Sequence, residues 1–76
     1  MLTDEQVLAA IRKGGGIDGA KSIDIDEEFE SLGIDSLDVF NVLLEIEALT
    51  GIKVPDADVE KLTSARAVLN YFNSKT

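Results

Sequence analysis

The chain contains no cysteine and no histidine among its 76 residues. Without cysteine it can form neither disulfide bonds nor thiolate metal sites, which excludes the disulfide framework typical of small secreted domains. Without histidine it lacks the commonest general base and metal ligand. A domain of this size also has little interior in which to bury an active site. We therefore expect no catalytic residues and no independent enzyme activity.

Basic residues are scarce as well, since seven Lys and Arg stand against fifteen Asp and Glu and give a net charge of −8. Such a charge repels nucleic acid and anionic lipid and favours protein partners with basic surfaces. Residues 1–5 lack the basic and apolar regions of a signal peptide, and no apolar run is long enough to cross a bilayer. We expect a soluble, cytoplasmic monomer that binds neither nucleic acid nor membrane.

The acidic segment 24–28 has the composition of a calcium site but not its spacing. An EF-hand loop requires glycine at its sixth position, and counting from Asp24 that position holds Phe29. Counting from Asp56, the same position holds Lys61. The sequence therefore predicts no metal site, and the segment is typical of a solvated acidic loop.

Helical periodicity first appears over residues 4–13. Thr3 and Gln6 form a capping-box pattern at its start, and the glycine run 14–16 is expected to end it. The segment 14–35 that follows is longer than most loops of a compact domain. We expect it to be pinned to the core by its apolar residues, which are Ile17, Ile23, Ile25, Phe29 and Leu32.

A second helix is predicted over residues 36–50, with Gly51 as the residue that ends it. Its core-facing side consists of apolar residues at helical spacing, which are Val39, Val42, Leu43 and Ile46. A second apolar face, bordered by Asn41, Glu45 and Glu47, consists of Leu37, Phe40, Leu44 and Ala48. This second face is either further core or an exposed surface for protein contacts, and its charged border favours the exposed surface.

A short third helix is predicted over residues 57–61. Residues 52–54 form a brief extended stretch, which Pro55 ends. Asp56 follows the proline and is expected to be the N-cap of the short helix, because aspartate is among the residues preferred at that position.

The last helix is predicted over residues 64–73, with Thr63 or Ser64 as its cap. Its core-facing stripe consists of Ala65, Val68, Leu69 and Phe72. Tyr71 lies off that stripe and is expected to reach a polar partner. Together the segments predict one all-α domain over residues 1–76, a four-helix bundle of three main helices and one short helix with a long loop between the first two.

Ser36 lies at the junction between the long loop and the second predicted helix. A serine or aspartate in front of an apolar helix is usually its N-cap, so either Ser36 or Asp35 is expected to cap this one. The N-terminus of a helix also has unpaired N–H groups and a partial positive charge. A phosphate ester on Ser36 would therefore be electrostatically favoured, which makes the serine a candidate for modification.

Three segments of the chain resemble the acyl carrier proteins, namely Leu32-Gly33-Ile34-Asp35-Ser36-Leu37-Asp38, Val54-Pro55-Asp56 and Ala67-Val68-Leu69-Asn70-Tyr71-Phe72. The resemblance covers nearly the whole chain. It implies a four-helix bundle in which Ser36 carries a 4′-phosphopantetheine arm, attached from coenzyme A by a phosphopantetheinyl transferase. The thiol of the arm would hold an acyl chain as a thioester, so a thioester carrier can lack cysteine.

The resemblance also implies that the helix after Ser36 is the recognition helix for synthase, reductase and acyltransferase partners with basic surfaces. Acidic side chains would then steer the encounter, and apolar side chains would form the centre of each short-lived contact. The candidate partner-binding residues are Asp35, Leu37, Asp38, Phe40, Asn41, Leu44, Glu45, Glu47, Ala48 and Asp56.

Two alternatives concern the cargo and the pathway. Asn41, Ala48 and Lys53 stand where carriers of bacterial fatty acid synthesis often have glutamate, which leaves fatty acid and polyketide-type pathways both open. Aminoacyl and peptidyl carriers usually have two glycines before the motif serine, where this chain has Ile34-Asp35, so an acyl cargo is favoured.

An alternative from another class is an unmodified helical adaptor that binds one partner through the same apolar face. In that case Ser36 would serve only as a helix cap. The two readings differ in intact mass, because only a carrier gains one phosphopantetheinyl group on Ser36.

Overall fold

The computed structural model describes residues 1–17 and 22–75. In these ranges it contains α1 (Asp4–Gly14), α2 (Ser36–Thr50), α3 (Asp56–Val59), α4 (Ala65–Ser74) and a short 3₁₀-helix, η1 (Phe29–Leu32). No strand occurs in them, which confirms the prediction of an all-α fold with three main helices and one short one. Within the described ranges, no helix is both long and apolar enough to span a membrane.

Helix α1 begins at the predicted capping box. The Thr3 hydroxyl accepts the N–H of Gln6 at 3.2 Å, and the Gln6 side-chain oxygen accepts the N–H of Thr3 at 3.0 Å. The predicted end of the helix is one residue too early, because Gly14 is still helical. A Cβ atom at Gly14 would lie 2.6 Å from the backbone nitrogen of Val42, so glycine is required here for the close approach of α1 to α2.

Helix α2 has the predicted limits, and its cap is Asp35 rather than Ser36. The Asp35 carboxylate accepts the N–H of Asp38 at 3.0 Å, and Ser36 is already the first helical residue. The helix ends at Gly51, whose φ of 75° is a left-handed conformation that glycine adopts without strain. All four predicted core-facing residues are buried, with at most 8 % of each exposed.

The prediction for the short third helix was wrong at both ends. The helix begins at Asp56 instead of after it, and Pro55 occupies the N-cap with its carbonyl accepting the N–H of Asp58 at 2.9 Å. Proline suits this position because its φ is fixed and its missing N–H would have no helical partner there. The helix ends at Val59, where the following N–H groups bond three residues back in a tighter turn.

Helix α4 is capped by Ser64, whose hydroxyl accepts the N–H of Ala67 at 3.1 Å. It therefore begins one residue later than predicted. Its predicted apolar stripe is buried. Tyr71 reaches a polar partner, as expected, because its hydroxyl donates to the Asp58 carboxylate at 2.9 Å and connects α4 to α3.

The bond between Tyr71 and Asp58 predicts a loss of stability in alkali. Desolvation by burial and the hydrogen bond to Asp58 raise the pKa of Tyr71 above its ordinary value of 10.0. As the pH rises, Tyr71 therefore ionises in the unfolded chain before it ionises in the folded one. The stability that the protonated Tyr71 contributes is fully present below a pH of about 10 and is lost as the pH rises through the folded pKa. Urea unfolding across this range should show a smaller decline for Tyr71→Phe than for the wild type, and equal declines would contradict the assignment.

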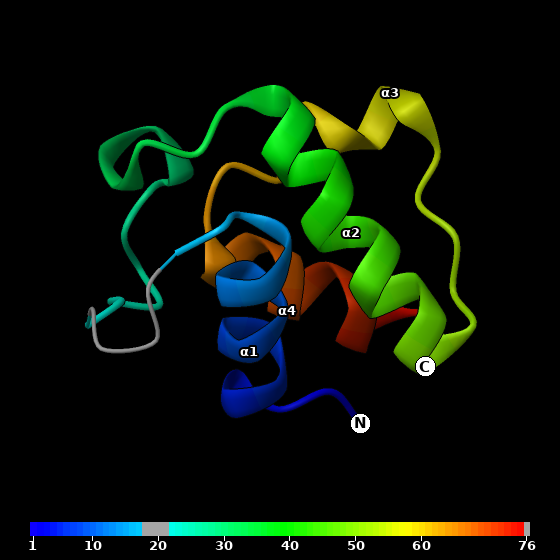
Figure 1. Ribbon diagram of the computed structural model, residues 1–76. Coiled ribbons are helices and arrows are strands. Elements are labelled where there is room, and N and C mark those ends of the chain that lie inside the picture. Colours follow the sequence, from blue (N-terminus) through cyan, green and yellow to red (C-terminus); the bar gives the residue numbers. More distant parts are fainter. Residues whose placement is uncertain (18–21, 76) are drawn as a thin grey trace.

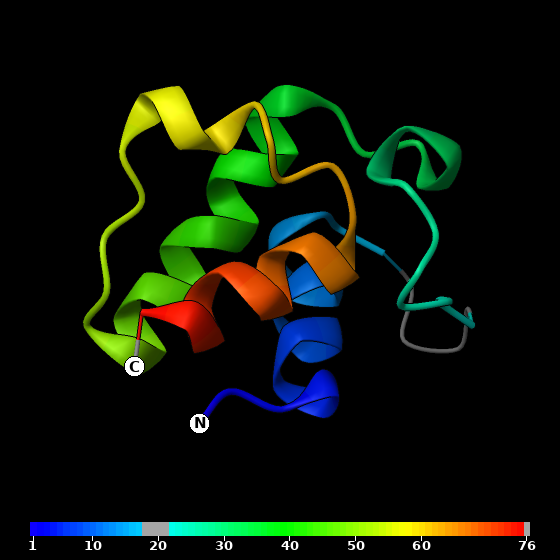
Figure 2. The same cartoon turned by 180° about the vertical axis from the view of Figure 1, so that it is seen from behind.

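The three main helices enclose one hydrophobic core. Helix α1 packs against both α2 and α4, and α3 lies beside the N-terminal half of α2 (Figure 1). The N-terminus and the C-terminal end of α4 lie at the end of the molecule opposite the start of α2, as the view from behind also shows (Figure 2). Ser36 is therefore at the other end of the molecule.

The described residues of the long loop before η1, residues 22–28, lie against the start of α4 together with Phe29. The predicted apolar anchors of the loop all belong to the core or pack against it. Backbone hydrogen bonds add to these anchors, with the Phe29 N–H donating to the Thr63 carbonyl and the Arg66 N–H to the Ile25 carbonyl, each at 2.8 Å. The Arg66 guanidinium also binds the Asp26 carboxylate at 2.9 Å. These contacts position η1, which was not predicted, next to the start of α2.

Candidate functional site

Ser36 presents a free hydroxyl at the start of α2. The residue is exposed, and the cap that a serine could have supplied is already supplied by Asp35. Within the described part of the chain, the Ser36 hydroxyl makes no hydrogen bond. The interpretation of Ser36 as a helix cap is therefore wrong, and its hydroxyl is accessible for reaction.

The helix N-terminus around Ser36 suits a negatively charged group. Asp35 accepts the N–H groups of Asp38 and Val39 at 3.0 Å, through its side chain and its carbonyl respectively. The N–H groups of Ser36 and Leu37 have no acceptor among the described residues. These two donors and the positive end of the 15-residue helix would stabilise a phosphodiester on Ser36.

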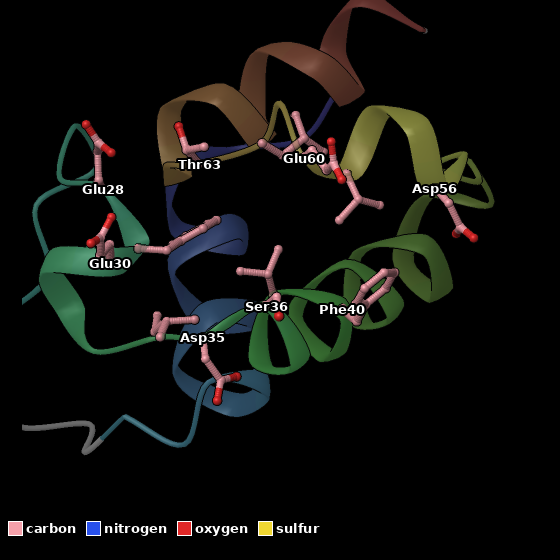
Figure 3. A pocket seen from close by; sticks show the side chains of 13 residues that line it. Glu28, Glu30, Asp35, Ser36, Phe40, Asp56, Glu60 and Thr63 are labelled. Carbon is pink, nitrogen blue, oxygen red and sulfur yellow. The ribbon is translucent and has the colours of Figure 1, made fainter.

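A cavity of about 500 Å³ opens beside Ser36, between η1, α2 and α3. Its floor is apolar and buried, and consists of Phe29, Ile34, Val39 and Leu62. Its rim carries five carboxylates, which belong to Glu28, Glu30, Asp35, Asp56 and Glu60. Figure 3 shows Ser36 and Phe40 along α2, with Glu30 on one side of the cavity and Asp56 on the other. An apolar floor of this kind suits an uncharged ligand.

The second apolar face of α2 is exposed. Leu37, Phe40 and Leu44 are 68 %, 42 % and 60 % exposed, and they follow one another at helical spacing from Ser36 toward the middle of α2. Asn41 and Ala48 are exposed as well. The alternative that this face belongs to the core is therefore wrong. A row of exposed apolar side chains on a charged helix is typical of a protein contact surface.

The candidate acidic residues differ in their exposure and in the ion pairs that their carboxylates form. Asp35 and Asp56 are exposed, and Asp38 is half-buried. Glu45 forms an ion pair with Lys13 on α1, with 3.4 Å between nitrogen and oxygen. Surface pairs of this kind contribute only about 0–1 kcal/mol, so a partner could compete for this carboxylate.

Glu47 is held much more firmly than the other acids of α2. Its carboxylate accepts the N–H of Val54 at 2.9 Å and lies 3.9 Å from the ammonium of Lys53. Only 12 % of its side chain is exposed. These contacts connect the end of α2 to the stretch before α3, so Glu47 has a structural role that its sequence position did not indicate.

The sequence did not single out the residues that face Ser36 across the cavity. Glu28 and Glu30 come from the region of η1, and Val59 and Glu60 come from α3 and the turn after it. No local pattern marks them, because they belong to segments that are distant in the sequence and come together only in the fold.

The fold and the serine at the start of α2 define a class of proteins. Residues 5–72 match the family model described as the phosphopantetheine attachment site. This match covers nearly all of the described helices and includes Ser36. The protein is therefore a phosphopantetheine-binding carrier domain by class.

Comparison with individual proteins narrows the class. The chain is 35 % identical over 75 residues to the acyl carrier protein of Campylobacter jejuni strain RM1221, covering 97 % of this chain and 96 % of that protein. It is 30 % identical over 70 residues to the acyl carrier protein of Thermotoga maritima, covering 92 % of this chain and 86 % of that one. The chain belongs to the acyl carrier protein family.

A solved structure agrees with this assignment. The solution structure of butyryl-ACP from the actinorhodin polyketide synthase of Streptomyces coelicolor superimposes with a TM-score of 0.84 at 26 % identity. The superposition covers 99 % of this chain and 91 % of that one. The helical carrier fold predicted from the sequence is confirmed, and members of this family are carriers rather than catalysts.

Proposed function

We propose that Ser36 carries a 4′-phosphopantetheine arm and that the protein, as a single carrier domain, presents acyl intermediates to the enzymes of a fatty acid or polyketide-type pathway. The observation that carries this proposal is the exposed Ser36 hydroxyl, which has no hydrogen bond in the described part of the chain and lies at the N-terminus of α2 beside the cavity. When bound, the arm supplies the thiol that this cysteine-free chain lacks.

The residues around Ser36 support the loading reaction. Loading joins the Ser36 oxygen to the pantetheine-bearing phosphorus of coenzyme A, with adenosine 3′,5′-bisphosphate as the leaving group and the hydroxyl proton passing to the transferase. Because Asp35 caps the helix, Ser36 can react without loss of that cap. The product places a negative phosphodiester near the unpaired N–H groups of Ser36 and Leu37, where the helix dipole is favourable.

The loading experiment tests this function directly. The purified protein, incubated with coenzyme A and a phosphopantetheinyl transferase, should gain the mass of one phosphopantetheinyl group. After incubation with an acyl donor and its transferase it should gain one acyl group more, which hydroxylamine should remove because the bond is a thioester. No mass gain with several transferases would contradict the proposal and favour the unmodified adaptor.

We further propose that α2 is the surface on which basic partners dock, including the phosphopantetheinyl transferase, synthases, reductases and acyltransferases. The exposed row Leu37, Phe40 and Leu44 would form the apolar centre of the contact. Asp35, Asp38 and Asp56 would supply the charge around it, which chiefly raises the rate of encounter.

Reversal of one acid on α2 should slow loading. Asp38→Lys is expected to lower the loading rate about tenfold at low ionic strength, with a smaller effect in high salt, because a positive charge beside Ser36 repels a basic transferase. Glu5→Lys is a matched control, since Glu5 also lies in the first turn of a helix and the change in net charge is equal. It should stay within about twofold of the wild type. Equal rates for the two variants would exclude α2 as the docking surface.

A further inference from the structure

Two cavities along α2 share part of their lining, which includes Phe40. The first, of about 500 Å³, is the one that includes Ser36. The second, of about 230 Å³, lies between α2 and the segment 53–59, and its lining includes Leu44 and Val54. The residues that line both cavities are Phe40, Asp56 and Val59.

Phe40 is the residue of α2 that lines both cavities. It follows Ser36 by four residues, which is about one helical turn, so both side chains lie on the same side of α2. Figure 3 shows Phe40 on α2 beyond Ser36, on the side of the first cavity toward Asp56. The residue is 42 % exposed and does not belong to the buried core.

The chemistry of the first cavity indicates what it can hold. Its floor is apolar, and the charged groups on its rim are all carboxylates, since no lysine or arginine is among the described residues that line it. A ligand that ends in a carboxylate would be repelled by this rim, whereas an aliphatic chain would gain by leaving water. The second cavity continues with apolar residues beyond Phe40, namely Leu43, Leu44 and Val54.

We propose that Phe40 limits the length of acyl chain that this carrier holds against its own surface. The inference rests on the proposed function, because the chain is delivered by an arm on Ser36. An uncharged aliphatic chain enters the first cavity and extends toward α3 until it meets the ring of Phe40. A longer chain exposes its end to water, because the ring keeps it out of the second cavity.

The test compares acyl chains of different length on three proteins, the wild type, Phe40→Ala and Leu49→Ala. Leu49 is the matched control, since it is an exposed leucine of the same helix and lines neither cavity. Each protein is loaded with butyryl, octanoyl and palmitoyl groups, and methyl NMR spectra are recorded. Ile34 and Leu62 report on the first cavity, and Leu44 and Val54 report on the second.

In the wild type and in Leu49→Ala, the octanoyl group should shift the Ile34 and Leu62 methyl signals. The palmitoyl group should cause little shift of the Leu44 and Val54 methyl signals in these two proteins. In Phe40→Ala the palmitoyl group should shift the Leu44 and Val54 signals as well. The melting temperature should stop rising between octanoyl and palmitoyl in the wild type and should continue to rise in Phe40→Ala. Phe40→Leu, a smaller change, should give an intermediate response.

The outcomes separate this inference from the proposed function. If no protein gains the arm in intact-mass measurements, the proposed function has failed. If all are loaded but palmitoyl shifts Leu44 and Val54 equally in the wild type and in Phe40→Ala, then Phe40 does not limit chain length. If no acyl group shifts Ile34 or Leu62, the chain stays outside the first cavity and the inference is also wrong. A malonyl group, which ends in a carboxylate, should leave both pairs of signals unshifted.

Discussion

Ser36→Ala will abolish attachment of the phosphopantetheine arm and leave the fold almost unchanged. Attachment requires the hydroxyl oxygen, which alanine lacks. Stability should change by no more than about 0.5 kcal/mol, because the hydroxyl has no hydrogen bond among the described residues and the substitution is on the surface. Intact mass after incubation with coenzyme A and a transferase measures the first effect, and urea unfolding measures the second.

Two other substitutions serve as controls for this result. Ser31→Ala removes an exposed serine from the neighbouring η1 and should load like the wild type. Asp35→Ala removes the cap of α2 and should cost about 1 kcal/mol, more than Ser36→Ala does. Arm attachment to the Ser36→Ala protein would disprove the site, and a larger loss of stability for Ser36→Ala than for Asp35→Ala would disprove the assignment of the cap.

Gly14→Ala will have the largest effect on stability of the substitutions considered. A Cβ atom at this position would lie 2.6 Å from the nitrogen and 2.8 Å from the Cα atom of Val42, so α1 and α2 would have to move apart. Overpacking against backbone is expected to cost about 3 kcal/mol. That is a large share of the roughly 4–11 kcal/mol available to a chain of this length. It also exceeds the gain of about 1 kcal/mol that alanine offers over glycine inside a helix.

Gly51→Ala is the control for Gly14→Ala, because the two glycines are needed for different reasons. A Cβ atom at Gly51 meets no neighbour within 4 Å, and the cost there arises only from the left-handed φ of 75°. That strain is worth about 1–2 kcal/mol. Urea unfolding should therefore give a lower free energy of unfolding for Gly14→Ala than for Gly51→Ala. The reverse order would mean that the contact between α1 and α2 relaxes easily.

Local chemistry made the start of α1 and both ends of α2 predictable. The capping box of Thr3 and Gln6 and the glycine at Gly51 each act within a few residues, so their effects can be read from the sequence. The apolar spacing of α2 and α4 predicted their buried faces for the same reason. The choice between Asp35 and Ser36 could not be made from the sequence, because both residue types cap helices well.

The errors arose where tertiary contacts or proline decided the local structure. Gly14 resembles a helix terminator in sequence, but it is still helical, and glycine is needed there because the backbone of Val42 in α2 comes so close. At α3 the cap fell on Pro55 instead of Asp56, because the carbonyl and fixed φ of the proline sufficed to start the helix.

The cavity beside Ser36 could be predicted least of all. The motif around Ser36 indicated the loading site, and the second apolar face of α2 indicated an exposed surface, but neither indicated a cavity. The cavity is lined by segments that are distant in the sequence, such as those of Phe29 and Thr63, which share a backbone hydrogen bond. The inward position of the Glu47 carboxylate likewise depends on its bond to Val54, which no spacing rule predicts.

Site mapping of the loaded protein tests the central claim most directly. After incubation with coenzyme A and a transferase, trypsin should release residues 22–53, a peptide that contains Ser22, Ser31 and Ser36. Fragmentation that preserves side-chain modifications should place one phosphopantetheinyl group on Ser36 and leave the other two serines unmodified. A group on Ser22 or Ser31, or an unmodified peptide from fully active transferase, would contradict the assignment of Ser36 as the residue that carries the arm.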